Sequence, residues 1–166
     1  MIPASPIHDD DELPPLTVTS FSDLSFLVID DSTISCDLIE GILGSASVGK
    51  VTKAPSVFAA AGILTGPNSK TDCIICDHHM DGMTGLAFLQ RIRAGKNAIV
   101  PRDLPFILLT EDTSAELVHA ARALDVSGLI KKPIGVGPVL KSIHLALGRE
   151  MRLKHAAAYA AVKCPA

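Results

Sequence analysis

Polar side chains that could handle a phosphoryl group follow the short apolar runs of this sequence. The runs Phe26–Ile29, Cys73–Cys76, Phe106–Leu109 and Gly128–Ile130 are followed by Asp30 and Asp31, by Asp77, by Thr110 and by Lys132, respectively. Carboxylates bind divalent cations, and an ammonium group and a hydroxyl can both contact phosphoryl oxygens. A carboxylate can also act as a nucleophile and form an aspartyl phosphate. The pattern therefore indicates phosphoryl transfer onto an aspartate, with Asp77 as the candidate acceptor.

Each of these runs is predicted to be a strand. Short runs without polar alternation are typical of strands buried on both faces of a parallel sheet. Helical patterns separate them, after Ser32 up to Gly44, from Pro55 to Leu64, from Thr84 to Arg93, from Ser114 to Leu124 and from Pro138 onward, and Lys50–Ala54 is a weak candidate for an edge strand. This alternation predicts an α/β fold, a doubly wound five-stranded parallel sheet with helices on both faces.

The predicted strand ends would gather the polar side chains around one pocket. Neighbouring parallel strands lie about 4.8 Å apart, and open α/β sheets bind ligands at the carboxyl edge. Asp30, Asp31 and Asp77 would crowd together there, and like charges at short range oppose joint ionisation. A Mg²⁺ ion would relieve this repulsion, because it prefers oxygen ligands and keeps several waters. Lys132 and Thr110 would complete a clamp on a phosphoryl group.

The order of these motifs resembles the receiver domain of two-component response regulators, over roughly residues 24–148. The matching residues are the acidic pair Asp30-Asp31, the acceptor Asp77 with Met80, Met83 and Gly85 in the loop after it, Thr110, and Lys132-Pro133. The resemblance implies the flavodoxin-like strand order 2-1-3-4-5. It also implies a signalling phosphoacceptor rather than an enzyme, one that assists only its own phosphoryl transfer and dephosphorylation.

The resemblance further implies a role for each residue. Asp31, Asp77 and the backbone carbonyl of His79 would ligate Mg²⁺, and Asp30 would assist directly or through water. Thr110 and Lys132 would contact the phosphoryl oxygens and convert their presence into movement near the fourth strand. The implied donor is a histidine kinase or a histidine phosphotransfer protein, and the implied output is altered affinity for a downstream protein target.

Three positions depart from the family's pattern. Asp81 stands where the family usually has proline, which places an extra negative charge in the loop beside Asp77. Glu111 follows Thr110 where small residues are usual, so we expect its carboxylate to obstruct small phosphodonors. Leu129 stands where an aromatic side chain often moves inward on activation, and an aliphatic side chain cannot make that movement. We therefore expect an intact phosphorylation site with an altered readout.

Composition and charge exclude several other classes. The net charge is −3, and four of the 18 acidic residues lie in the N-terminal Asp9–Glu12 run, so the remaining 14 nearly balance 15 Lys and Arg. That balance argues against a nucleic-acid footprint. The sequence has no secretory signal and no apolar run of about 18 residues, so we expect a cytoplasmic protein without a membrane partner.

The Cys73/Cys76 pair formally matches a metal-binding spacing. Residues three apart on a strand point to opposite faces, so these thiols cannot converge on one ion, and reduced, buried cysteines are expected. The histidines that follow, His78 and His79, are expected on the surface of a loop.

Three segments are expected along the chain. Residues 1–20, rich in proline and acid, read as a disordered tail, residues 21–148 as the receiver domain, and residues 149–166 as a C-terminal helical extension or tail. The final helix could continue past Gly148 through the Ala-rich stretch near Tyr159, and this extension could support a homodimer or lead into a further domain.

Two other functions stay open. One is a receiver-like protein-interaction module that works without phosphorylation, suggested by Asp81, Glu111 and Leu129. The other is a Mg²⁺-dependent phosphohydrolase with an aspartate nucleophile. That class normally has a cap or a second acid two residues after the nucleophile, and here His79 occupies that position.

Overall fold

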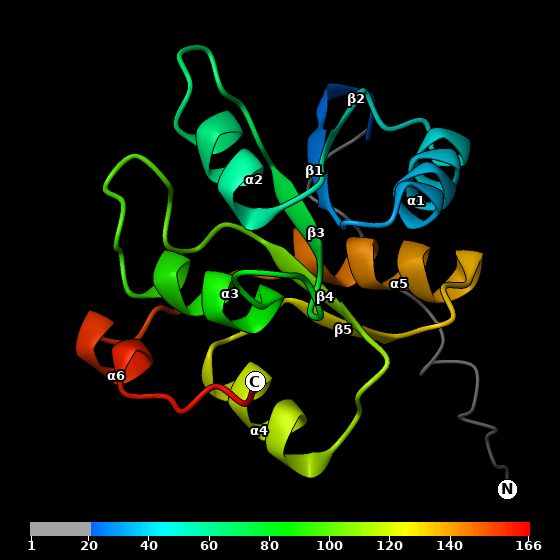
Figure 1. Ribbon diagram of the computed structural model, residues 1–166. Coiled ribbons are helices and arrows are strands. Elements are labelled where there is room, and N and C mark those ends of the chain that lie inside the picture. Colours follow the sequence, from blue (N-terminus) through cyan, green and yellow to red (C-terminus); the bar gives the residue numbers. More distant parts are fainter. Residues whose placement is uncertain (1–20) are drawn as a thin grey trace, which may run out of the picture.

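A parallel sheet forms the centre of the computed structural model, which describes residues 21–166 (Figure 1). Its strands are β1 (Ser25–Ile29), β2 (Lys50–Ala54), β3 (Cys73–Asp77), β4 (Phe106–Thr110) and β5 (Gly128–Lys131). All pairs are parallel and the order is β2-β1-β3-β4-β5. The predicted fold class, strand order and edge strand Lys50–Ala54 are confirmed. The expectation for residues 1–20 lies outside the described residues.

The helices follow the predicted alternation closely. A short 3-10 helix, Phe21–Asp23, precedes β1, and the α-helices are α1 (Thr33–Ser45), α2 (Val57–Leu64), α3 (Gly85–Arg93), α4 (Ala115–Ala123), α5 (Val136–Leu147) and α6 (Ala156–Ala160). Hydroxyl side chains cap the first four α-helices, because the residues Ser32, Ser56, Thr84 and Ser114 each accept a hydrogen bond from a backbone N–H three positions later. Such caps satisfy N–H groups that the helix leaves without a partner. The sequence therefore specifies where these helices begin.

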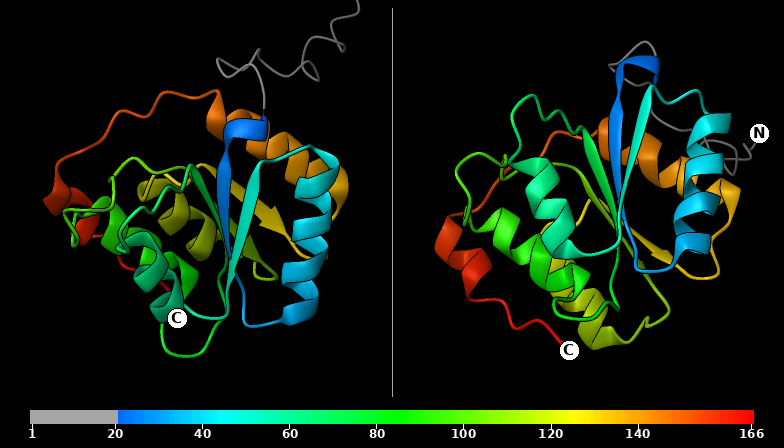
Figure 2. Two further views of the ribbon diagram at one scale, coloured as in Figure 1. Left: turned by 90° about the horizontal axis from the view of Figure 1, so that it is seen from above. Right: turned by 45° about the horizontal axis from the view of Figure 1, so that its top comes forward.

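The helices form two layers around the sheet (Figures 1 and 2). Buried side chains of α1 and α5 pack against one face, and those of α2, α3 and α4 pack against the other. Cys73 belongs to the first of these two cores and Cys76 to the second, which confirms that the two thiols lie on opposite faces of the sheet. All four cysteines are free.

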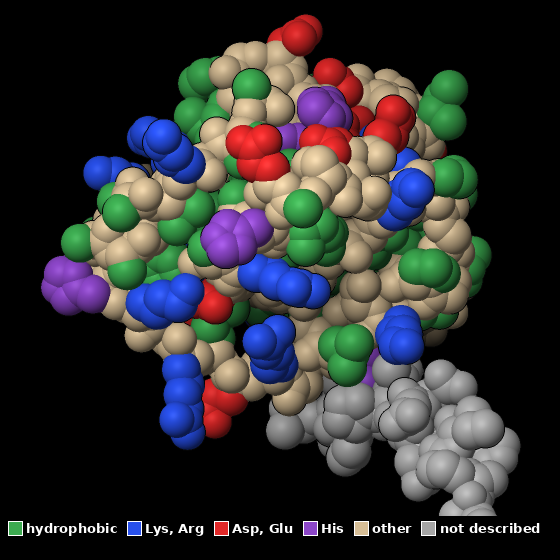
Figure 3. Space-filling model, turned by 90° about the horizontal axis from the view of Figure 1, so that it is seen from below, with side chains coloured by type: hydrophobic (Ala, Val, Ile, Leu, Met, Phe, Trp, Pro, Cys, Tyr) green, Lys and Arg blue, Asp and Glu red, His purple; other side chains and the backbone are tan. Residues whose placement is uncertain are grey.

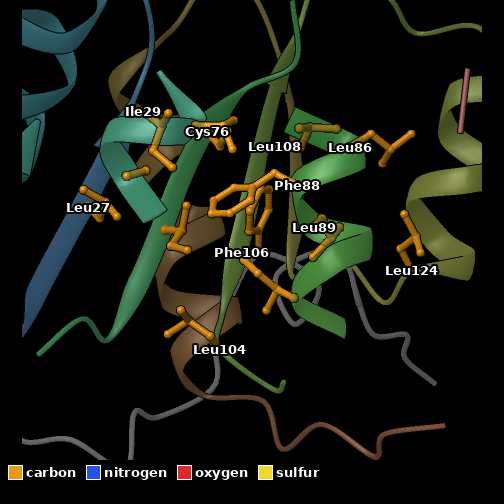
Figure 4. Close-up of a cluster of buried hydrophobic side chains, with 14 of the residues drawn as sticks. Leu27, Ile29, Cys76, Leu86, Phe88, Leu89, Leu104, Phe106, Leu108 and Leu124 are labelled. Carbon is orange, nitrogen blue, oxygen red and sulfur yellow. The ribbon is translucent and has the colours of Figure 1, made fainter. Parts of the chain in front are cut away.

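The core on the α3 side is built from aliphatic residues around one aromatic pair (Figure 4). The rings of Phe88 from α3 and Phe106 from β4 meet edge to face, with centroids 6.2 Å apart. Leu86 and Leu89 of α3 are fully buried beside them. This packing fixes α3, which begins directly after the loop that follows Asp77.

The C-terminal region does not form the continuous helix that the sequence left possible. The last helix of the domain starts at Val136 rather than Pro138, with Gly135 as its N-cap, and it ends at Leu147. Residues 148–155 contain no helix, and α6 is separate and lies beside α3. The reason is tertiary packing, because Tyr159 is completely buried against α3 and the α4–β5 connection and cannot reach that position from a straight continuation of α5.

No helix within residues 21–166 is both long and apolar enough to cross a lipid bilayer.

Candidate functional site

Asp77 is the last residue of the central strand β3, and it is only 5% exposed. The backbone of α3 approaches it closely, because the Gly85 N–H donates to the His78 carbonyl at 3.0 Å. A side chain at Gly85 would collide with the Asp77 carbonyl oxygen. Glycine at this position therefore allows the loop after Asp77 to close tightly and holds the aspartate in a partly desolvated pocket.

Three carboxylates meet at this pocket. Single carboxylate oxygens of Asp30, Asp31 and Asp77 all lie within 4.8 Å of one another. Asp30 is buried and its Oδ1 accepts the Ser32 N–H at 2.9 Å, whereas Asp31 is exposed. The structure thus brings together the acidic residues that the sequence predicted to meet.

Lys132 is the cation that faces this cluster. Its Nζ lies 3.1 Å from Asp77 Oδ1 and 3.3 Å from Asp30 Oδ2. The Lys132 N–H donates to the Thr110 carbonyl at 2.9 Å, which places the side chain beside the end of β4. Lys131, by contrast, is exposed.

The charges of the site alter its proton equilibria. Burial, followed by the negative charge of Asp30, raises the pKa of Asp77, and this rise is opposed by the hydrogen bond from Lys132. Burial by itself would lower the pKa of Lys132, but the hydrogen bond and charge of Asp77, together with Asp30, raise it overall. One ammonium group therefore does not fully compensate two buried carboxylates.

Thr110 is buried at the end of β4, but its hydroxyl is held by its own loop. Oγ1 accepts the Asp112 N–H at 2.9 Å and donates to the Asp112 carbonyl at 3.0 Å. The Asp112 carboxylate in turn accepts the N–H of Ser114, the N-cap of α4, at 2.8 Å. The role of Asp112 as the hydrogen-bond partner of Thr110 could not be predicted from the sequence, because it depends on the conformation of the loop.

Two of the three residues that depart from the family's pattern, Asp81 and Glu111, lie beside the site. His79 and Asp81 are exposed and line one hollow with Asp31. Glu111 is exposed and lines a second hollow with Lys132. Leu129 is partly buried and packs against the core on the α3 side. Seen from below, acidic side chains and histidine gather along one edge of this face, and basic side chains spread over the rest of it (Figure 3).

His78 corrects the expectation that both loop histidines lie on the surface. Its side chain is completely buried, and Nδ1 accepts the Leu86 N–H at 3.4 Å. Burial, followed by the positive charge of His79, lowers the pKa of His78, so it is neutral at pH 7. The side chain lies under α3 because the loop turns sharply at Gly85. The residues around His78 form no pattern that predicts this burial.

Comparison with known proteins bears directly on this fold and site. The model of the response regulator receiver domain matches residues 26–144. A probable chemotaxis protein CheY of Rhizobium etli is 26% identical over 125 residues, which are 75% of this chain and 93% of the relative. The two-component response regulator ARR17 of Arabidopsis thaliana is 28% identical over 129 residues, covering 72% of this chain and 82% of the relative.

Solved structures agree with this assignment. The chemotaxis response regulator CheY4 of Vibrio cholerae superposes with a TM-score of 0.65 at 26% identity and covers 75% of this chain and 98% of its own. A putative response regulator from Chloroflexus aurantiacus, 21% identical, has a TM-score of 0.67 over 76% of this chain and 98% of its own, and so supports the fold alone. Fold and family agree, and the chain belongs to the response regulator receiver domain family, which confirms the resemblance found in the sequence.

Proposed function

We propose that this receiver domain, residues 21–148, accepts a phosphoryl group on Asp77 from a phosphohistidine donor with Mg²⁺, and that it then changes its affinity for a downstream protein. The observation that carries the proposal is the position of Lys132 Nζ, 3.1 Å from Asp77 and 3.3 Å from Asp30 beside a third carboxylate. A cation against a nucleophilic carboxylate at a sheet edge is suited to bind the charge of an incoming phosphoryl group.

The carboxylate cluster fits a Mg²⁺ ion. The three carboxylates face one ammonium group, so the pocket carries excess negative charge and offers the oxygen ligands that Mg²⁺ prefers. Asp31 and Asp77 would hold the ion with the His79 carbonyl, and Asp30 would assist. When bound, Mg²⁺ supplies positive charge that screens the acceptor from the phosphoryl oxygens.

The proposed transfer is a displacement at phosphorus. A carboxylate oxygen of Asp77 forms the new P–O bond, the P–N bond of the phosphohistidine breaks, and the imidazole nitrogen keeps the electron pair. Lys132 Nζ is close enough to contact the phosphoryl oxygens during the transfer while it remains near Asp30. The protein's part in such a reaction is mainly positioning and charge stabilisation.

The readout of the proposed switch begins at Thr110. Its hydroxyl is engaged with Asp112 and would have to leave both of those hydrogen bonds to contact a phosphoryl oxygen. The Asp112–Ser114 turn that caps α4 would lose this anchor, so α4 would shift. Leu129 lies where the family often has an aromatic side chain, so the output would depend on the α4 shift rather than on an aromatic rotamer.

The proposal includes its setting and partners. The donor is a histidine kinase or a histidine phosphotransfer protein, and the location is the cytoplasm, where the four free cysteines stay reduced. A homodimer is compatible with the proposal but is not required by it.

A receiver-like module that binds its partner without phosphorylation is the second candidate. The observation that favours it is the exposed Glu111 carboxylate, which lines the same hollow as Lys132 and disfavours small anionic donors.

Intact mass after incubation with Mg²⁺ and either acetyl phosphate or a phosphorylated histidine protein tests the proposal. We expect one phosphoryl group on the wild type and none on Asp77→Asn. The absence of labelling with either donor would reject the proposal in favour of the module that works without phosphorylation. Labelling that survives in Asp77→Asn would show a different acceptor.

A further inference from the structure

Residues 151–166, here called the C-terminal strap, are fastened to α3 by one side chain. The Gln90 amide nitrogen donates to the carbonyls of Tyr159 at 2.9 Å and Val162 at 2.7 Å. The amide oxygen of Gln90 accepts from the Cys164 thiol at 3.4 Å. Both the nitrogen and the oxygen of this amide therefore form hydrogen bonds with the strap. A glutamine of α3 whose amide binds two carbonyls and a thiol of another segment indicates a specific docking site.

Tyr159 fastens the strap to the connection between α4 and β5. The ring is completely buried and the hydroxyl donates to the Asp125 carboxylate at 2.6 Å. The same hydroxyl accepts the Lys154 N–H at 3.0 Å, and Lys154 Nζ donates to the Ala123 carbonyl at 2.9 Å. The guanidinium of Arg102 lies 5.6 Å from the ring centroid. The strap therefore bridges α3 and the end of α4.

Beyond Tyr159 the strap turns back toward the phosphorylation site. Ala161, Val162 and Lys163 line one hollow together with residues along the length of α4, namely Ala115, Glu116, His119, Ala120 and Ala123. Ala166 lines the hollow that also contains His79 and Asp81. Figures 1 and 2 show the same course, in which the segment after α6 passes from α3 to the side of α4.

The two helices under the strap lead directly from the site. α3 begins at Gly85, after the loop that follows Asp77, and its first N–H groups are bound by His78. The N-cap of α4 is Ser114, which binds Asp112, and Asp112 is held by two hydrogen bonds with Thr110. At the far end, the buried Arg93 donates to the carbonyls of Leu124 and Asp125 and locks α3 to the α4–β5 connection. Any shift therefore occurs at the ends of the helices nearest Asp77, where the strap's last residues lie.

We infer that the C-terminal strap is an intramolecular latch on α3 and α4 that opens when Asp77 carries a phosphoryl group. This inference rests on the proposed function. Release of Thr110 from Asp112 moves the start of α4, and the strap residues 161–166 lose the surface against which they lie. Opening exposes the α3–α4 surface to a protein partner, so the strap competes with that partner in the unphosphorylated state.

The thiol of Cys164 provides the readout. Cys164 is partly buried under Gln90, whereas the other cysteines, Cys36, Cys73 and Cys76, are buried in the two cores. Maleimide alkylation in native buffer therefore reports opening of the strap, and peptide mapping confirms which cysteine reacts. With Mg²⁺ and a phosphohistidine donor we expect Cys164 to react about fivefold faster or more, a typical size for coupling between two sites. Asp77→Asn should show no acceleration.

One intact-mass spectrum detects both the phosphoryl group and the maleimide adduct. The proposed function and the latch can therefore be rejected independently of each other. Absence of the phosphoryl adduct would reject the proposed function. A phosphoryl adduct with an unchanged Cys164 rate would overturn the latch alone.

Two variants that weaken the attachment of the strap test the latch without changing a residue of the site. Tyr159→Phe and Gln90→Ala should speed Cys164 alkylation without any donor, whereas Arg91→Ala, an exposed position on the same helix, should not. Linkage requires the reverse effect as well, so both variants should bind beryllofluoride, a phosphoryl analogue, more tightly than the wild type. Unchanged affinity in variants whose strap has opened would show that the strap and the site are not coupled.

Discussion

The ammonium group of Lys132 lies 3.1 Å from a carboxylate oxygen of Asp77, although β4 separates the strands from which the two residues come. The ion pair spans the end of β4, where Thr110 is buried. Because a second buried carboxylate, Asp30, competes for the same ammonium group at 3.3 Å, the site carries unbalanced negative charge that a bound cation would neutralise.

Replacement of Asp77 by asparagine is expected to stabilise the fold in the absence of divalent cations. Burial and Asp30 raise the pKa of Asp77 in the folded state. A raised carboxyl pKa favours folding below the unfolded value, and that contribution is lost as pH rises through the folded value. At pH 7 we therefore expect Asp77→Asn to raise the free energy of unfolding by about 1 kcal/mol, a gain that disappears toward about pH 4.

Urea unfolding at pH 4, 5.5 and 7 measures this effect. Millimolar Mg²⁺ should stabilise the wild type and reduce the advantage of the variant. A variant less stable than the wild type at pH 7 without Mg²⁺ would contradict charge crowding between Asp77 and Asp30.

Removal of the Lys132 ammonium is expected to slow phosphoryl uptake severely. Loss of one preorganised group that stabilises developing charge typically costs about 100-fold in rate. We expect Lys132→Ala to label about 100-fold more slowly in a time course of intact mass. The matched control is Lys131→Ala, which removes an exposed ammonium one residue away and should label at the wild-type rate. Equal losses in both variants would indicate a general basic patch instead of a positioned cation.

Glu111 is expected to slow labelling by small anionic donors. Its exposed carboxylate lines the hollow that contains Lys132, so Glu111→Ala removes a repulsive charge from the approach. We expect labelling by acetyl phosphate to become about threefold faster at low salt, with little gain at 1 M salt, because exposed charges are screened. Glu116→Ala, an exposed acid within α4, is the control. Equal rates of labelling by acetyl phosphate in Glu111→Ala and the wild type would contradict a gating role for Glu111.

Arg93 is expected to be essential for stability although it takes no part in the chemistry. Its guanidinium is completely buried and donates to the carbonyls of Arg102, Leu104, Leu124 and Asp125. Burial lowers its pKa to about 10, so it is still charged at pH 7. Arg93→Met would leave several buried carbonyls without donors, and we expect a loss of about 3–5 kcal/mol in the free energy of unfolding.

Urea unfolding of Arg93→Met beside Arg91→Met checks this expectation, because Arg91 is an exposed residue of the same helix. A loss below about 1 kcal/mol in Arg93→Met would mean that water replaces the guanidinium without cost.

The strand ends and helix starts could be predicted because their signals are local. Buried parallel strands need uninterrupted apolar residues, as in Cys73–Cys76, and helices need a hydroxyl before the first turn, as at Ser114. The order of acidic, hydroxyl and lysine residues along the chain was sufficient to identify the family. Those local features determined the fold class, the carboxylate cluster and the position of Lys132 at the same pocket.

Other features depended on contacts between distant segments. The Thr110 hydroxyl is turned toward Asp112 because the loop conformation supplies both partners there, and His78 is buried because α3 closes over it. The Ala-rich stretch near Tyr159 has a helical composition that fits a continued α5, yet it forms a separate helix beside α3. Burying the Tyr159 ring and satisfying its hydroxyl at Asp125 requires the chain to leave the axis of α5. The sequence by itself determined the fold and which candidate residues would lie together, because strand ends at one sheet edge must meet. Only the tertiary structure decided the course of the C-terminal strap, because that course depends on side-chain partners that no local pattern specifies.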